Sequence, residues 1–216
     1  MPCYDDLDML PGDESTSISR AEAEYLYALV VRLQPRATLE VGLGYGCSAA
    51  YVMAGAQTAH YAMDPLQSVY QGLGLKNIEK LGLARFLTFY PEYAHVALPR
   101  LLDQGVRVEF AFLDGGHRFD DIFIDFYYAD LLLENGGHIC LHDTWMRSTQ
   151  TVASWVRRNK KNFTAVSTPM RNLALFRKTG VDSRPWYHFR GFATSKGLVS
   201  HSFSNFKRRL RRFRPT

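Results

Sequence analysis

The sequence has 216 residues, 46% of them hydrophobic, and a formal net charge of +5. A chain of this size usually folds as one α/β domain with a sizeable core, and no window approaches the run of about 18 apolar residues that would predict a membrane-spanning helix. The positive charge is concentrated in residues 171–216, which hold 12 Lys or Arg and one acid, so that residues 1–170 carry a net charge of −6.

Helical and strand patterns alternate along the chain. Ser19-x-x-Glu22 is a capping box that opens an amphipathic helix ending near Gln34. Since strand–helix alternation implies a parallel sheet with right-handed crossovers, we predict a Rossmann-like, doubly wound α/β fold. The last two strands form a predicted hairpin, which would give this mostly parallel, seven-stranded sheet an antiparallel C-terminal edge strand. The predicted strands are 37–41, 58–63, 85–90, 108–113, 139–141, 163–167 and 172–177, and the predicted helices are 19–34, 48–56, 69–81, 95–104, 119–133 (closed by the glycine pair 136–137) and 149–159.

The first predicted strand carries Glu40 and turns into the glycines Gly42, Gly44 and Gly46 before a helix begins. Alternate glycines permit positive φ and let the backbone approach a ligand closely, as in the first unit of a nucleotide-binding sheet. The dinucleotide fingerprint has its third glycine where Cys47 stands. An acid two residues before the first glycine also fits a cation better than a pyrophosphate. These departures favour S-adenosylmethionine (SAM), whose amino group and sulfonium are positive.

Polar residues stand at the carboxyl ends of the following strands, where such sheets bind their ligands. Asp64 ends the second strand, 24 residues after Glu40, and an acid there can accept both ribose hydroxyls. The alternative for Asp64 is a turn-forming Asp-Pro pair. Glu92 follows the third strand and either binds an adenine amino group or is a surface acid. Ser48 either meets a ligand carboxylate at a helix N-terminus or only caps that helix.

A second polar cluster reads Asp114-Gly-Gly-His117 and is followed about 25 residues later by Gly136-Gly137 and His142-Asp143. Together with the glycine turn, these elements resemble the class I SAM-dependent methyltransferases. Within that class the chain is most similar to the small-molecule O-methyltransferases, a group that includes catechol O-methyltransferase-like and antibiotic-tailoring enzymes. We accordingly expect an N-terminal extension (1–16), a methyltransferase domain (17–178) and a basic, aromatic C-terminal extension (179–216).

The resemblance implies a role for each cofactor-binding position. Glu40 and the Gly42–Gly46 turn would hold the methionine part of SAM, with Ser48 near its carboxylate. Asp64 would bind the ribose, and Glu92 would lie near the adenine.

The resemblance also implies a metal site. Asp114 and Asp143 match positions that bind magnesium in metal-dependent members, and two hard carboxylates suit magnesium or another divalent cation. Asp114 is also one of the residues expected to contact the cofactor. Those members commonly have two acids or Asp-Asn at the last strand end. Here it reads His142-Asp143-Thr144, and histidine is a poorer magnesium ligand.

Methyl transfer requires an acceptor oxygen that is aligned behind the sulfonium methyl group and loses its proton. His117 and His142 are the candidate catalytic bases beside Asp114, because both follow strand ends and histidine titrates near neutral pH. Each histidine has a structural hydrogen bond as its alternative role. A bound metal would lower the pKa of the acceptor hydroxyl and make a histidine base less necessary.

The acceptor is expected to be a small molecule or a glycan, and a homo-oligomer is left open. Residues before 17 and the segment 180–206 are candidates for a substrate lid, although the aromatics of the latter can equally pack on the sheet edge. The basic run 207–214 either touches an anionic surface or is a solvated tail.

Three scattered cysteines without a CxxC pair, and an acidic N-terminus without the features of a signal peptide, predict a reduced, cytoplasmic protein. Two other functional classes stay open. One is a methyltransferase-like binding or scaffold protein without catalysis, and the other is an NAD(P)-binding oxidoreductase.

Overall fold

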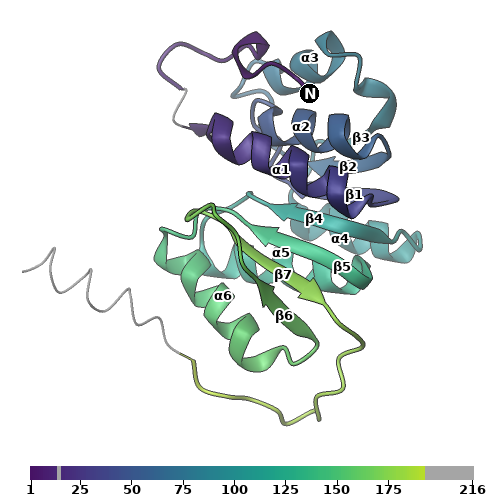
Figure 1. Ribbon diagram of the computed structural model, residues 1–216, viewed down its shortest axis with the longest axis vertical. Coiled ribbons are helices and arrows are strands. Elements are labelled where there is room, and N and C mark those ends of the chain that lie inside the picture. Colours follow the sequence, from purple (N-terminus) through teal and green to yellow (C-terminus); the bar gives the residue numbers. More distant parts are fainter. Residues whose placement is uncertain (14–15, 193–216) are drawn as a thin grey trace, which may run out of the picture.

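The computed structural model describes residues 1–13 and 16–192, which form a seven-stranded sheet with helices on both faces (Figure 1). The strands are β1 (Ala37–Val41), β2 (Ala59–Met63), β3 (Leu87–Tyr90), β4 (Val108–Leu113), β5 (Leu133–Leu141), β6 (Phe163–Val166) and β7 (Ala174–Lys178). The helices are η1 (Tyr4–Asp6), α1 (Arg20–Leu33), α2 (Cys47–Ala56), α3 (Leu73–Lys80), η3 (Ala84–Phe86), α4 (Ala94–Asp103), α5 (Phe119–Leu132) and α6 (Arg147–Asn159).

The strand order is β3-β2-β1-β4-β5-β7-β6, and the pairs from β3 to β5 are all parallel. Strand β7 runs antiparallel to both of its neighbours and lies between β5 and the edge strand β6. This sheet confirms the predicted Rossmann-like, mostly parallel fold with an antiparallel C-terminal strand. The chain winds outward from β1 through β3 and then returns to β4, so the strand order reverses between β1 and β4, which is where such sheets bind ligands.

Two apolar layers hold the helices on the sheet. Strand β4 shows why, because its successive side chains point to opposite faces. Phe110 and Phe112 join the layer packed by α1, α2 and α3, whereas Ala111 and Leu113 join the layer packed by α4, α5 and α6. Each helix is therefore held by an apolar stripe, and the strand ends are left free for polar residues.

The capping box predicted at the start of α1 is present. Ser19 N donates to Glu22 Oε2 at 2.8 Å, and Glu22 N donates to Ser19 Oγ at 3.4 Å. The helix starts at Arg20 and ends at Leu33, close to the predicted bounds.

Three predicted boundaries were wrong, each for a local reason. Helix α3 starts at Leu73, not at residue 69, because Gln71 and Gly72 adopt positive φ and form a turn. Strand β3 is shorter than predicted, since residues 84–86 form a 3-10 helix. Strand β5 starts at Leu133 and contains Gly136 and Gly137, which were expected to follow the end of a helix.

No described helix is both long and apolar enough to cross a membrane. The basic run 207–214, and residues 193–206 of the predicted lid segment, lie outside the described residues. The division of the chain at residues 16 and 178 stays a prediction.

Candidate cofactor and acceptor site

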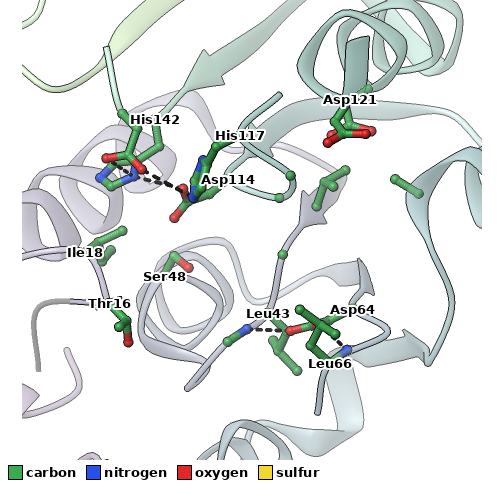
Figure 2. A pocket seen from close by; sticks show the side chains of 18 of the residues that line it. Thr16, Ile18, Leu43, Ser48, Asp64, Leu66, Asp114, His117, Asp121 and His142 are labelled. Carbon is green, nitrogen blue, oxygen red and sulfur yellow. Dashed lines mark hydrogen bonds and ion pairs between the residues drawn. The ribbon is translucent and has the colours of Figure 1, made fainter. Parts of the chain in front are cut away.

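A cavity of about 1140 Å³ opens at the carboxyl ends of β1, β2, β4 and β5. Backbone hydrogen bonds extend the ladder past these ends, from Gly42 N to Met63 O, from Asp114 N to Val41 O, and from His142 N to Leu113 O. Polar residues that are far apart in the sequence are thereby brought together (Figure 2). Of the predicted site residues, Gly42, Gly44, Ser48, Asp64, Asp114, His117, His142 and Asp143 line the cavity, whereas Glu40, Gly46 and Glu92 do not.

The glycine turn forms one side of the cavity. At Gly42, φ is +89° and a Cβ atom would lie 2.2 Å from Asp114 O, so no other residue fits there. Gly44 also has positive φ, but nothing lies within 4 Å of the position of its Cβ. Its backbone therefore borders open space, which is the arrangement that a closely bound ligand requires.

Asp64 is held in place by the protein before any ligand binds. The residue is 4% exposed. Its carboxylate accepts hydrogen bonds from Gly44 N at 2.8 Å, Leu66 N at 2.7 Å and Gln67 Nε2 at 3.0 Å. Figure 2 shows the first two of these bonds, of which the bond from Gly44 N ties the glycine turn to the loop after β2 and the bond from Leu66 N lies within that loop. Each carboxylate oxygen offers about two acceptor sites, so the group retains some capacity for a ligand hydroxyl.

Glu40 lies behind the cavity wall, contrary to its predicted contact with the ligand. It is fully buried, and Ser48 Oγ donates to its Oε1 at 2.5 Å. Its Oε2 lies 3.4 Å from His60 Nε2, and burial raises the pKa of the Glu40 carboxyl. Because Ser48 lines the cavity, Glu40 acts on the site through the position of that hydroxyl.

Gly46 and Glu92 are also absent from the wall. A Cβ atom on Gly46 would lie 2.8 Å from Gly74 O, so this glycine allows α2 to pack against α3. Glu92 forms an ion pair with Arg100 of α4 at 3.0 Å, which turns its carboxylate to the protein. The residues that line the cavity directly after Glu92 are Tyr93, Ala94 and His95, and the rings of Tyr93 and His95 stack with centroids 5.5 Å apart.

His142 is buried and held at both ring nitrogens. Its Nδ1 lies 2.9 Å from Asp114 Oδ1, while its Nε2 lies 3.1 Å from the amide of Asn172 and 3.6 Å from Glu22 Oε1. Burial opposes the imidazolium form, but hydrogen bonds to Asp114 and Glu22 prevail and raise the pKa of His142 to about 10. The same contact lowers the pKa of Glu22 to about 2. His142 therefore joins α1 to the strand ends as a cation.

His117 has a more open environment. Its side chain is 46% exposed, and its Nε2 lies 3.6 Å from Asp143 Oδ2. Asp143 adopts φ of +52° and accepts from Trp145 Nε1 at 2.9 Å. Both candidate bases line the cavity, and His117 is the more exposed of the two.

The donor atoms of Asp114, His117 and Asp143 all lie within 4.8 Å of one another. The structure thus brings together the two predicted carboxylates and adds His117, which sequence reasoning did not assign to a metal. Two carboxylates and an imidazole suit a transition-metal ion such as Zn²⁺ or Mn²⁺ better than Mg²⁺, which is bound almost entirely by oxygen donors.

Sequence reasoning missed two acids of α5 that line the cavity, Asp121 and Asp125. Asp125 is 5% exposed and has no hydrogen-bond partner among the described residues. Burial, and secondly the charge of Asp121, raise the pKa of Asp125 to about 7. A Cβ atom on Gly116 would lie 2.6 Å from Asp121 Oδ2, so the glycine lets this acid approach the loop. The four-residue spacing, which places both acids on one helix face, is the signal that could have found them.

The two predicted lid segments differ in where they lie. Thr16, the last residue of the first segment, lines the cavity, as do Ser17 and Ile18, which follow it before α1. Residues 180–192 do not line it, because they contact α6 instead.

Residues 39–144 match a family model described as a methyltransferase domain. Over these residues the chain is similar to methyltransferases. The match covers the glycine turn, Asp64 and the strand ends that carry Asp114 and His142. It confirms the resemblance to class I SAM-dependent methyltransferases. No curated protein sequence matches the chain.

Solved structures support the same fold at low sequence identity. The O-methyltransferase TomG of Streptomyces achromogenes, involved in tomaymycin synthesis and solved with SAM, superposes with a TM-score of 0.66 at 18% identity, over 77% of this chain and 83% of that one. An O-methyltransferase of Bacillus cereus in complex with SAH gives 0.63 at 15% identity, over 75% and 81%. The SAH-bound methyltransferase PaMTH1 of Podospora anserina gives 0.66 at 14% identity, over 78% and 82%.

Proposed function

We propose that this protein transfers the methyl group of SAM to a hydroxyl oxygen of a small molecule or a glycan. The observation that carries the proposal is one cavity with two chemically distinct sides. A bare glycine turn and the fixed carboxylate of Asp64 lie on one side, and His117, with Asp114 and Asp143, lies on the other. The solved O-methyltransferases with SAM or SAH support this assignment through their fold.

The cofactor would lie along the glycine side of the cavity. Its methionine part would contact Gly44 and Ser48, and its ribose hydroxyls would donate to Asp64, whose oxygens are already aimed by Gly44 N and Leu66 N. These groups fit SAM because nothing lies within 4 Å of the Cβ position of Gly44, so a ligand can approach the backbone there.

The adenine would lie beyond Asp64, between the stacked rings of Tyr93 and His95 and the acids of α5. Since Glu92 is paired with Arg100, we assign the amino group of adenine to Asp121 and Asp125. Asp125 has the acceptor capacity for this bond, because no described residue donates to it.

The acceptor would lie beside His117. Holding its oxygen in line with the methyl group supplies much of the rate enhancement, and a positioned base typically adds about 10²–10⁴-fold. We assign the base to His117 because His142 has a carboxylate near each ring nitrogen, Asp114 at Nδ1 and Glu22 at Nε2, and is held as a cation that cannot accept a proton. His142 would position Asp114 and α1.

A divalent cation bound by Asp114, His117 and Asp143 would lower the pKa of an acceptor hydroxyl. One histidine nitrogen cannot both bind a cation and accept a proton. At Nε2, the nitrogen that faces Asp143, the two roles of His117 exclude each other, and removal of metal distinguishes them.

The test is calorimetric titration of the full chain with SAM, in buffer with Mn²⁺, with Mg²⁺ and with EDTA. Micromolar binding in all three supports the cofactor assignment. Turnover of a catechol in EDTA supports His117 as the base, whereas turnover restored only by Mn²⁺ or Mg²⁺ supports the metal. Absence of SAM binding in every buffer would overturn the proposal; NADH would then be titrated to test the oxidoreductase alternative. Binding without turnover of any hydroxyl acceptor would favour the scaffold.

A further inference from the structure

The segment after β7 leaves the sheet at the end opposite the cavity. Lys178 ends β7, and this end pairs with Phe163 at the start of β6, whereas the cavity lies at the carboxyl ends of the parallel strands. Figure 1 shows the chain continuing, in yellow, past the ends of β6 and α6. We call residues 181–190 the aromatic strap.

Buried contacts hold the aromatic strap at both ends. Near its start, Asp182 pairs with Arg184 and with Lys160, whose ammonium group also pairs with Asp130 at 2.5 Å. At its end, Asn159 donates to Arg190 O at 3.0 Å and accepts from Arg190 N at 2.7 Å. Lys160 is 6% exposed, so the ion pairs of this cluster are largely shielded from water and fix the start of the strap on the protein.

Between these anchors the strap exposes large apolar side chains. The exposed fraction is 96% for Trp186, 71% for Tyr187, 70% for Phe189 and 78% for Val181. Contiguous exposed apolar groups on an anchored segment mark an interaction surface.

The surroundings of the strap are cationic. Arg157 and Arg158 at the end of α6, Lys161 and Arg190 are exposed, and the one acid of the strap, Asp182, is paired. Residues 193–216, outside the described part of the chain, add seven Lys or Arg and no acid to the sequence. The complementary partner is therefore anionic and has an apolar layer.

We propose that the aromatic strap docks this protein on the headgroup region of an anionic lipid bilayer. Trp and Tyr rings are suited to the interface between water and lipid, and each nearby Lys or Arg strengthens binding to an anionic leaflet. The cavity, at the other end of the sheet, would stay open to water. The inference is independent of the proposed methyl transfer.

The ring geometry favours lipid over single-stranded nucleic acid. Trp186 and Tyr187 meet edge to face at 89°, and Phe189 and Phe192 meet at 67°. Bases are bound by stacking on open ring faces presented in series, and rings that meet edge to face do not present such a series.

The test is sedimentation of the full chain with phosphatidylcholine vesicles, with and without phosphatidylglycerol. We expect binding that requires the anionic lipid and weakens with salt. Trp186→Ala/Phe189→Ala should weaken it at least about tenfold, since two interfacial rings are lost. Arg157→Gln/Arg158→Gln should weaken it by about fivefold per cation. The matched control is Tyr127→Ala/Leu131→Ala, which removes two side chains exposed on α5 and should leave vesicle binding unchanged. Equal melting temperatures of all variants check that they fold.

Three results would overturn the proposal. The first is no binding to anionic vesicles while single-stranded RNA binds. The second is vesicle binding that survives Trp186→Ala/Phe189→Ala but disappears on removal of residues 193–216. The third is a dimer in sedimentation velocity that the strap variant abolishes, without any vesicle binding, which would assign the strap to a second copy of the chain.

Discussion

Two walls of the same cavity differ in whether their charged side chains have hydrogen-bond partners in the protein. Around Asp64 and His142, protein donors and acceptors engage the side chains that face the cavity. On α5, Asp125 is as deeply buried as Asp64 but has no hydrogen-bond partner among the described residues. Groups of the first kind are positioned by the fold, and groups of the second kind retain their hydrogen-bonding capacity for a ligand.

The largest effect is expected at His117, the exposed side chain of the reacting end. His117→Ala should lower kcat by about 10²–10⁴-fold and leave SAM affinity unchanged, because a general base is lost but no cofactor contact. Steady-state kinetics and calorimetry measure the two quantities. Added imidazole should restore part of the rate, and unchanged kcat in a folded variant would remove the assignment.

A substitution of Asp64 tests the wall whose charged side chains are held by protein hydrogen bonds. Asp64→Ala should weaken SAM binding at least about tenfold, because charge-assisted hydrogen bonds to the ribose are lost and Gly44 N loses its acceptor. Calorimetry of the variant measures this loss. Equal affinity in a folded variant would contradict the ribose assignment; the exposed Asp120→Asn serves as the control.

A substitution of Asp125 tests the wall formed by α5, and the measured quantity is the pH dependence of the protein's stability. Its folded-state pKa of about 7 exceeds the unfolded value of about 4, so the folded protein binds an extra proton between these values and stability falls as pH rises through that window. Asp125→Asn removes this loss of stability at high pH, because the amide side chain does not ionise. The cofactor-free variant should melt at a higher temperature than wild type at pH 8 and show no such advantage at pH 4. A variant that is no more stable at pH 8 would mean that the carboxylate has a partner; Asp120→Asn again is the control.

The smallest effect is expected at the capping box. Ser19→Ala should lower the free energy of unfolding by about 1 kcal/mol, since Glu22 N loses its acceptor. Denaturant unfolding measures it. A tenfold loss of turnover in the same variant would show that α1 also controls the site, through the contact of Glu22 with His142.

The sequence was informative where the determinant is local. Gly42 and Gly44 stand where positive φ is needed, and the polar residues at the strand ends predicted the position of the cavity. Those features follow from neighbouring residues and from the rule that parallel strands end together.

The wrong predictions depend on contacts between a strand or loop and the helix that follows it. Glu40 points toward α2 because it alternates with the apolar Leu39 and Val41, and Ser48 then engages it. Glu92 is removed from the cavity by Arg100. No pattern in the surrounding sequence announces these partners, because each depends on how a helix packs on the sheet.

The hydrogen bonds that the Asp64 carboxylate accepts from the protein also have a consequence for the rate of ligand binding. Gly44 N and Leu66 N already hold the carboxylate, so the loops after β1 and β2 need not order when a nucleoside arrives. SAM and its demethylated product would then associate with similar rate constants, and any difference in their affinities would lie in how fast each one leaves.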